Sequence, residues 1–263
     1  MRTQLSISLN GVELYNVDSS IIIQGIDEQM VNMNPTAASR AGLNGQHFIS
    51  LEKRYRDVVV SFAINEKRFG VRRQIYDKVC TWARDGGELQ VGYRNSDTVL
   101  YVVCTALPAL ANVSQWNNPM QMTFRAYDIP CWIDKIGIGH APADSSTDVS
   151  LNLPNDGSMP TKLEVMFANQ SGSTCNTVTI TSGDQKIRLT SLGLANGETL
   201  FINYDNKDIQ KIYIRNGSTN RSVMAKRTVD SNDDIWIPPR TTPVRVQSDV
   251  ALSLNSFARG RYD

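Results

Sequence analysis

The stretch MNPTAASRAGLNGQ, residues 33–46, decides how the first half of this chain is organised. Its residues are small and polar, Pro and Gly punctuate it, and segments with β-like patterning flank it on both sides. At this length, such a segment is either a long hairpin arm or a mobile loop. An arm would carry exposed backbone edges, and proteins that keep such edges usually pair them with another chain. The stretch therefore favours a chain that assembles with other chains.

The segments around this stretch alternate with a period of two. Apolar residues share one face in three places: Leu5, Ile7 and Leu9; Val58, Val60, Phe62 and Ile64; and Met120, Met122, Phe124 and Ala126. Such alternation predicts strands with one face on a core and the other toward water or a partner. The segment TVLYVVCTAL (98–107) is apolar on both faces, which predicts a central strand covered on both sides.

One helix is predicted in this half, within NEKRFGVRRQIYDKVCTWARDGG (65–87). Asn65 is expected to cap its start, and Gly86 and Gly87 to end it in a left-handed turn. The helix is amphipathic and has few neighbours of its own kind, so it must lie on a sheet, with the 98–107 strand as the expected support. Its apolar stripe comprises Val71, Ile75, Val79 and Trp82, widened by Tyr76 and Cys80. The remaining faces are expected to carry Lys67, Arg68, Arg72, Arg73 and Lys78.

The second half differs from the first in composition and in its predicted elements. The segment DKIGIGHAPADSSTD (134–148) is rich in Gly, Ala, Ser and Asp and predicts a linker. Short strands separated by turn clusters follow it, a spacing that suggests a β-sandwich. Their apolar pairs are Leu163/Val165/Phe167, Val178/Ile180, Ile187/Leu189, Leu200/Ile202, Ile212/Ile214, Ile235/Ile237, Val244/Val246 and Leu252/Leu254.

We therefore predict a mainly β fold with two domains. Residues 1–133 would form a β-sandwich-like domain with one α-helix and a long β-hairpin arm. Residues 134–149 would be a linker, and residues 150–263 a C-terminal β-sandwich.

The composition argues against several classes of function for this chain. The 263 residues carry a formal net charge of +1, with 41% hydrophobic and 20% charged residues, so nothing global attracts nucleic acid or an acidic membrane surface. No run approaches the roughly 20 apolar residues that span a bilayer, so no membrane insertion is expected. The first residues lack the apolar region of a signal peptide, so we expect synthesis and folding in the cytoplasm. The four cysteines form no C-x-x-C pair and are expected to be free thiols.

The sequence contains no recognisable catalytic, cofactor-binding or metal-binding residues, and no enzyme is predicted. His47 and His140 lack visible partners, and no nucleophile elbow, P-loop or dinucleotide-binding motif occurs. DSNDD (230–234) has the spacing that opens a calcium loop, but Ile235 and Thr241 stand where its Gly and Glu belong. An acidic surface turn is the favoured interpretation. The basic cluster KRYR (53–56) could bind nucleic acid, but a solvated face or a salt-bridged subunit contact is favoured.

The order of these features resembles the distal tail protein (Dit) family of phages with long, non-contractile tails (siphophages) and of related prophages. The resemblance covers nearly the whole chain. It rests on GIDEQMVNMNPTAASRAGLNGQ, LEKRYRDVVVSFAI and the helix RRQIYDKVCTWA, and on FRAYDIPCW, which fits the family's F-x-x-x-D-P-x-W/Y ending with Ile129 inserted. The family often has a Pro-Gly-x-Asn turn late in the second domain, which Pro238-Pro239-Arg240 replaces here.

The resemblance implies a structural virion protein at the tail tip. Such proteins form a homo-hexameric hub ring through the first domain, between the tail tube and the baseplate, with a central channel for DNA. They contact the tail-tube protein and the tail-associated or tape-measure proteins. A galectin-like second domain lies outward, where receptor-binding components attach. In this chain Pro35, Ser39, Arg40, Asn44 and Gln46 would belong to the arm at the subunit interface.

Other functions stay open at this point. The second β-sandwich alone would suit a carbohydrate-binding module, although Trp236 is its only tryptophan for stacking on sugars. Another phage tail component, such as a tail-tube protein or a baseplate adaptor, would share much of the same pattern.

Overall fold

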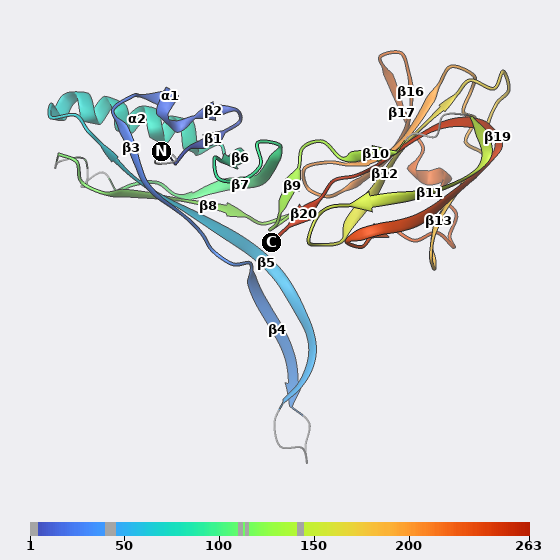
Figure 1. The fold of residues 1–263 in the computed structure, drawn as a ribbon, viewed down its shortest axis with the longest axis horizontal. Coiled ribbons are helices and arrows are strands. Elements are labelled where there is room, and N and C mark those ends of the chain that lie inside the picture. The colour runs from blue at the N-terminus through green and yellow to red at the C-terminus, as the bar shows by residue number, and fades with distance from the viewer. Residues whose placement is uncertain (1–4, 40–45, 110–112, 114–115, 141–144) are drawn as a thin grey trace. The chain divides into compact units, whose positions relative to one another are not determined.

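The computed structural model describes residues 5–39, 46–109, 113, 116–140 and 145–263. The chain folds as two compact units, Met1–Trp132 together with Asp263, and Ile133–Tyr262. Strands dominate both units and pair in antiparallel sheets, so the mainly β prediction is confirmed (Figure 1). None of the helices in the described residues combines the length and hydropathy needed to cross a membrane.

The sheet of the first unit runs in the order β2-β1-β6-β7-β8-β5-β3. Its strands are β1 (Ile7–Leu9), β2 (Val12–Glu13), β3 (Ile21–Glu28), β5 (Gln46–Ile64), β6 (Gly87–Val91), β7 (Thr98–Ala106) and β8 (Met120–Ala126). A further strand, β4 (Asn32–Ser39), pairs with the first half of β5. Two helices, α1 (Leu14–Val17) and α2 (Phe69–Arg84), complete the unit.

The core of the first unit follows the predicted alternation. Phe62 of β5 stands opposite Met120 of β8, and all of the alternating apolar residues at this junction are buried. The strand predicted over 98–107 is β7, which lies centrally between β6 and β8. Its coverage on both faces fails toward the end, where Val103 is exposed. The pairing with β6 ends opposite Val102, one residue before Val103.

Helix α2 lies against this sheet as predicted, and contacts both β7 and β8. The Trp82 ring meets Phe124 edge to face at 6.0 Å, and its indole N–H donates to the Val12 carbonyl oxygen. Ile75, Val79 and Cys80 are buried, whereas Val71, Tyr76 and Trp82 are half-buried. Gly86 and Gly87 have φ of 63° and 128°, so the predicted left-handed stop is confirmed.

Two details of this helix were predicted wrongly. Asn65 is not its cap, because the helix begins at Phe69 and Asn65 donates its backbone N–H to the Ser20 carbonyl oxygen. Arg72, expected on an exposed face, is buried. Its guanidinium donates to the carbonyl oxygens of Glu66 and Lys67, and to that of Val113. Arg72 thus holds the residues before the helix in a turn, which delays the helix start.

The main sheet path of the second unit runs β14-β13-β19-β12-β15-β16-β17. The elements of this unit are β10 (Ile138–His140), β11 (Ser146–Asn155), β12 (Thr161–Asn169), β13 (Val178–Ser182), β14 (Gln185–Leu189), β15 (Thr199–Tyr204), β16 (Gln210–Asn216), β17 (Thr219–Ser222), the 3₁₀ turn η2 (Met224–Lys226), β18 (Trp236–Ile237) and β19 (Arg240–Ala258). Two short strands at the ends of the unit, β9 (Trp132–Asp134) and β20 (Arg261–Tyr262), pair with each other outside this sheet. All of the apolar pairs predicted for this half are buried in one core. The four cysteines are free thiols.

Residues 134–149, predicted to be a linker, include parts of two strands. Ile138–His140 pairs with Ala258 to Ser256, and β11 begins at Ser146 and pairs along β19. Gly, Ser and Asp have low intrinsic strand preference, but the long neighbouring strand supplies hydrogen-bond partners that override it. The local composition could not reveal that neighbour.

The strands predicted at Val244/Val246 and Leu252/Leu254 are one continuous strand, the 19-residue β19. Its first half pairs with β11 and β13, and its second half with β12 and β10. One strand therefore takes part in both layers of the sandwich. The departure at Pro238-Pro239-Arg240 leads into β19, whose first residue, Arg240, has a φ of 89°.

Candidate functional site

The most distinctive feature of the first unit is a two-stranded ribbon, which we call the arm (residues 32–39 of β4 and 46–55 of β5). It leaves the sheet at Arg56, where β5 starts to pair with β8 (Figure 1). At about 3.3 Å per residue, the β5 part extends roughly 33 Å. Within the described residues, no third strand pairs with either edge of the arm. An isolated two-stranded ribbon is only marginally stable in water, so a partner would stabilise this one.

The structure places three of the five residues predicted for the arm. Pro35 lies opposite Leu51 and is exposed, and Ser39 pairs with Gln46 in the last described rung. Arg40 and Asn44 lie outside the described residues. The choice left open between a hairpin and a loop is settled as a hairpin for residues 32–39 and 46–55.

Three features interrupt the regular ladder of the arm. The register skips Arg54 and Ile49, so each is the extra residue of a β-bulge in β5. Pro35 has no N–H to donate, which removes one hydrogen bond from any strand added along β4. Bulges and prolines are typical of edges that avoid indiscriminate pairing. These features favour a specific partner over general strand-to-strand association.

Charged residues close the core where the arm begins. Arg56 continues the buried face of Val58 and Val60 and is itself only 4% exposed. Beside it, the Glu28 carboxylate accepts hydrogen bonds from both Nε and Nη2 of Arg94, the latter at 2.6 Å. We call this group, with Tyr93 and Trp132, the root cluster.

Glu28 is the most fully bonded member of the root cluster. The Trp132 indole N–H donates to it at 2.9 Å, the Tyr93 hydroxyl donates to its other oxygen, and the Arg94 guanidinium lies 4.6 Å from the Trp132 ring centre. Burial alone would raise the pKa of Glu28, but the hydrogen bonds from Arg94, Tyr93 and Trp132 outweigh it and lower the pKa. Trp132 closes the FRAYDIPCW segment, so the family-like ending has a packing role here.

Arg56 is much less well paired. Its one side-chain hydrogen bond within the described residues goes to Asp263, at 3.4 Å, and its Nε has no partner there. Burial lowers the pKa of Arg56, and the Asp263 carboxylate partly offsets this effect.

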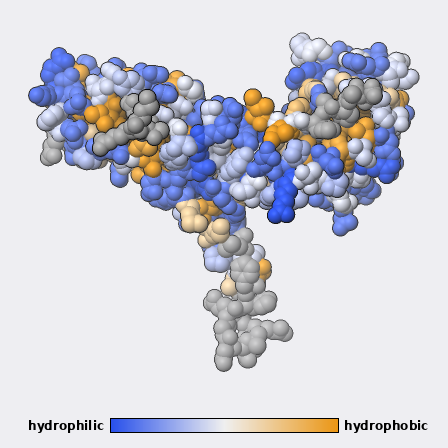
Figure 2. Space-filling view, viewed as in Figure 1, coloured by the Kyte–Doolittle hydropathy of each residue, from blue (hydrophilic) through white to orange (hydrophobic). Residues whose placement is uncertain are grey.

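A cavity of about 470 Å³ opens beside the root cluster. Arg56, Arg94 and Asp263 line it together with Met30, Val31 and Met33. Met30 is 88% exposed and Met33 is 43% exposed. Apolar surface is visible where the arm leaves the body of the unit (Figure 2). The cavity thus has apolar walls and charged groups among them.

The other face of β5 carries a second charged contact. Arg125 binds the Asp57 carboxylate with two hydrogen bonds of 2.6 and 2.7 Å, and its guanidinium lies 3.9 Å from the Tyr55 ring centre. In the KRYR cluster, Lys53 and Arg56 pair with Asp263, and Arg54 pairs with Glu52. Each basic side chain of this cluster has a carboxylate partner, which weakens the interpretation that the cluster binds nucleic acid.

Exposed apolar side chains are distributed unevenly between the units. Among the described residues, thirteen large exposed hydrophobic side chains lie in the first unit and six in the second. Those of the first unit include Val12 of β2, Tyr15 of α1 and Ile22 of β3, and also Phe69 and Trp116. Exposed apolar side chains are typical of protein–protein contact where they form a continuous patch.

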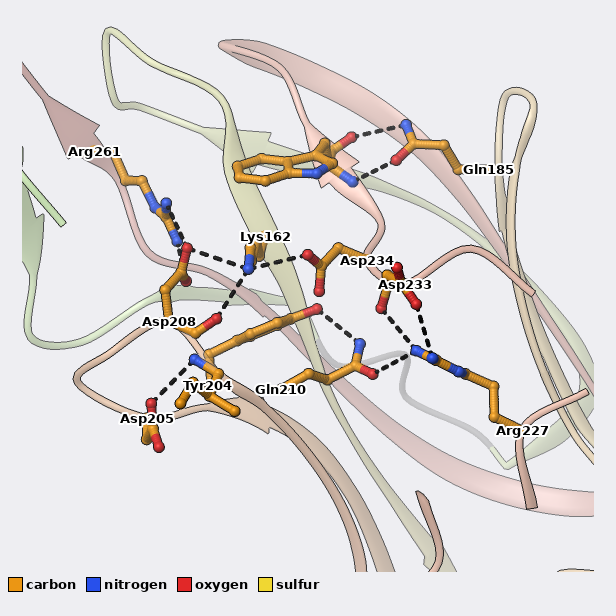
Figure 3. A network of polar contacts seen from close by, with 12 residues as sticks. Lys162, Gln185, Tyr204, Asp205, Asp208, Gln210, Arg227, Asp233, Asp234 and Arg261 are labelled. Carbon is orange, nitrogen blue, oxygen red and sulfur yellow. Dashed lines mark hydrogen bonds and ion pairs between the residues drawn. The ribbon is translucent and has the colours of Figure 1, made fainter. Parts of the chain in front are cut away.

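The second unit contains a polar network around Lys162 (Figure 3). Its ammonium group pairs with the carboxylates of Asp208 and Asp234 at 3.2 and 3.0 Å, and Arg261 also binds Asp208. The Trp236 ring centre lies 5.2 Å from this ammonium and 5.5 Å from the Arg261 guanidinium. These cations pack against the ring, which is 39% exposed, so part of the surface on which a sugar could stack is already occupied within the unit.

Side chains of the acidic turn 230–234 are bound by two lysines of the same unit. Asp230 binds Lys186, Asn232 accepts the Lys186 backbone N–H, and Asp234 binds Lys162. Within the described residues, no group of three or more His, Cys, Asp or Glu side chains could hold a metal ion. The side chains of His47 and His140 are not among those that the structure describes.

Comparison with solved structures finds proteins of the same overall fold. The chain is similar to the Dit protein of phage SPP1, described as a hub of the adsorption apparatus in phages that infect Gram-positive bacteria, with a TM-score of 0.74 and 11% identity over 98% of this chain and 99% of that one. It is also similar to a chain of the phage P2 baseplate in its activated conformation with calcium, with a TM-score of 0.53 and 8% identity over 98% and 97% of the two chains. No protein-family model and no curated protein matches the sequence.

Proposed function

We propose that this chain is a structural, non-enzymatic protein of a phage tail, where it serves as a hub at the tail tip. The observation that carries the proposal is the similarity to the SPP1 hub protein over nearly the full length of both chains. Both units of this chain are covered, so the likeness extends beyond one common β-sandwich. The resemblance found in the sequence is independent support for the same role.

The finer proposal is a homo-hexameric ring built by the first unit. Two observations support it: the arm has open edges, and exposed apolar side chains concentrate on this unit. In closed rotational symmetry, each arm can bind the next copy, so no open edge is left over.

The ring would lie between the tail-tube protein and the tape-measure or tail-tip proteins, with a central channel for DNA. A net charge of +1 suits passage, because few phosphates would be neutralised by the wall. The second unit would attach receptor-binding components. Assembly would take place in the cytoplasm of the host bacterium, and the finished protein would be part of the virion tail.

Negative-stain microscopy and light scattering of the full chain test this proposal. We expect rings of hexameric mass. Replacing residues 35–51 by Asn-Gly, which closes the hairpin at the Asn34–Glu52 pair, should leave the fold intact and abolish the ring. Val229→Lys, at an exposed position in the second unit, is the control and should keep the ring.

Two outcomes would contradict the proposal. A ring of unchanged mass in the shortened variant would show that the arm is not the ring-forming element. A tube that extends itself would point to a tail-tube protein instead of a hub.

A further inference from the structure

The cavity at the root of the arm has the chemistry of a receptor site for a protein segment. Its volume of about 470 Å³ exceeds that of a single side chain, and its apolar wall is formed by Met30, Val31 and Met33. Methionine side chains are flexible and polarisable, so they adapt to the shape of an apolar ligand. Met30 is 88% exposed, so its side chain contributes almost nothing to packing in the free chain.

The charges around the cavity are unequally satisfied. The Glu28 carboxylate is held by Arg94, Tyr93 and Trp132. Arg56, by contrast, is as buried as a core residue, and its one side-chain hydrogen bond within the described residues is a 3.4 Å contact with a carboxylate that is 53% exposed. A buried guanidinium normally has a carboxylate partner with close, two-pronged geometry. Asp263 takes the position of such a partner, but it makes only one long hydrogen bond with Arg56.

We propose that this cavity binds a segment of a partner protein in which an acidic side chain is flanked by apolar residues. The acidic group would pair with Arg56 in place of Asp263, and the apolar neighbours would lie on Met30 and Met33. The charge complementarity of Arg56 selects this occupant over a purely apolar one. The inference does not depend on the ring, because it concerns a site within one chain.

Calorimetric titration of the full chain at low salt tests the proposal with two capped tripeptides, acetyl-Leu-Glu-Leu-amide and its neutral counterpart acetyl-Leu-Gln-Leu-amide. The acidic peptide should bind about tenfold or more tightly than the neutral one, because its hydrogen bonds to Arg56 are charge-assisted. Arg56→Gln should remove this difference. Asp263→Asn should strengthen binding of the acidic peptide, since the competing carboxylate is lost.

Arg54→Gln is the matched control, because Arg54 lies two residues away on β5 and pairs with Glu52 at the surface. It should bind both peptides as the unchanged chain does. Equal binding of the two peptides by the unchanged chain, or no binding of either, would falsify the proposal without requiring any variant to fold. Weaker binding after Asp263→Asn would also overturn it.

Discussion

Single side chains in the root cluster decide how the first unit responds to pH. The pKa of Glu28 is lowered, so the folded state favours its ionised form. The resulting stabilisation is complete above the pKa of an unfolded glutamate, about 4.3, and is lost as the pH falls through the lower folded-state value. Glu28→Gln should therefore cost about 3 kcal/mol of unfolding free energy at pH 7, because Arg94 loses its partner.

Urea unfolding at pH 7 and at pH 3 measures this effect. The difference between Glu28→Gln and the unchanged chain should shrink at the lower pH. A difference that stays constant between the two pH values would mean that the ionised carboxylate contributes nothing. Glu28 and Arg94 could not be singled out from the sequence, because the residues of the root cluster come from β3, β5, β9 and the segment after β6.

At the scale of elements, the end of α2 depends on a single backbone position. Gly86 has a φ of 63°, and a Cβ atom there would lie 2.3 Å from the Val102 carbonyl oxygen. Gly86→Ala should cost about 2 kcal/mol or more in thermal unfolding. Gly70→Ala in the same helix meets no atom within 4 Å and should be neutral or stabilising by up to about 1 kcal/mol. Equal effects of the two substitutions would contradict this explanation.

Elements were predictable from sequence where a local pattern determines them. The period-two runs and the Gly86–Gly87 stop each identified a real element, since apolar alternation and positive φ are local properties. The start of α2 was missed, because it depends on Arg72 reaching carbonyl groups outside the helix. The strands at Ile138 and Ser146 were missed because distant β19 forms them. The arm was predicted as one of two alternatives, but its bulges at Ile49 and Arg54 were not.

On the scale of the whole molecule, each unit has its own core and should unfold in its own transition. Val60→Ala, in the core of the first unit, should lower one calorimetric transition by an amount that corresponds to about 2 kcal/mol. Lys162→Met, which leaves Asp234 without its cation, should lower only the other. Scanning calorimetry of the two variants would disprove this independence if either substitution shifted both transitions equally.

The connection between the units has an evolutionary consequence. The chain comes into the second unit along β9 and leaves it along β20, and these two strands pair. Asp134 and Gly260 are joined by a backbone hydrogen bond, and the Tyr262 hydroxyl donates to the Asp134 carboxylate. The second unit, which has more than a hundred residues, is therefore a single insertion into the first unit, and its two ends are joined at its base. Recombination could exchange such a cassette together with its paired base, so a lineage could replace this half while it keeps the arm and its sheet.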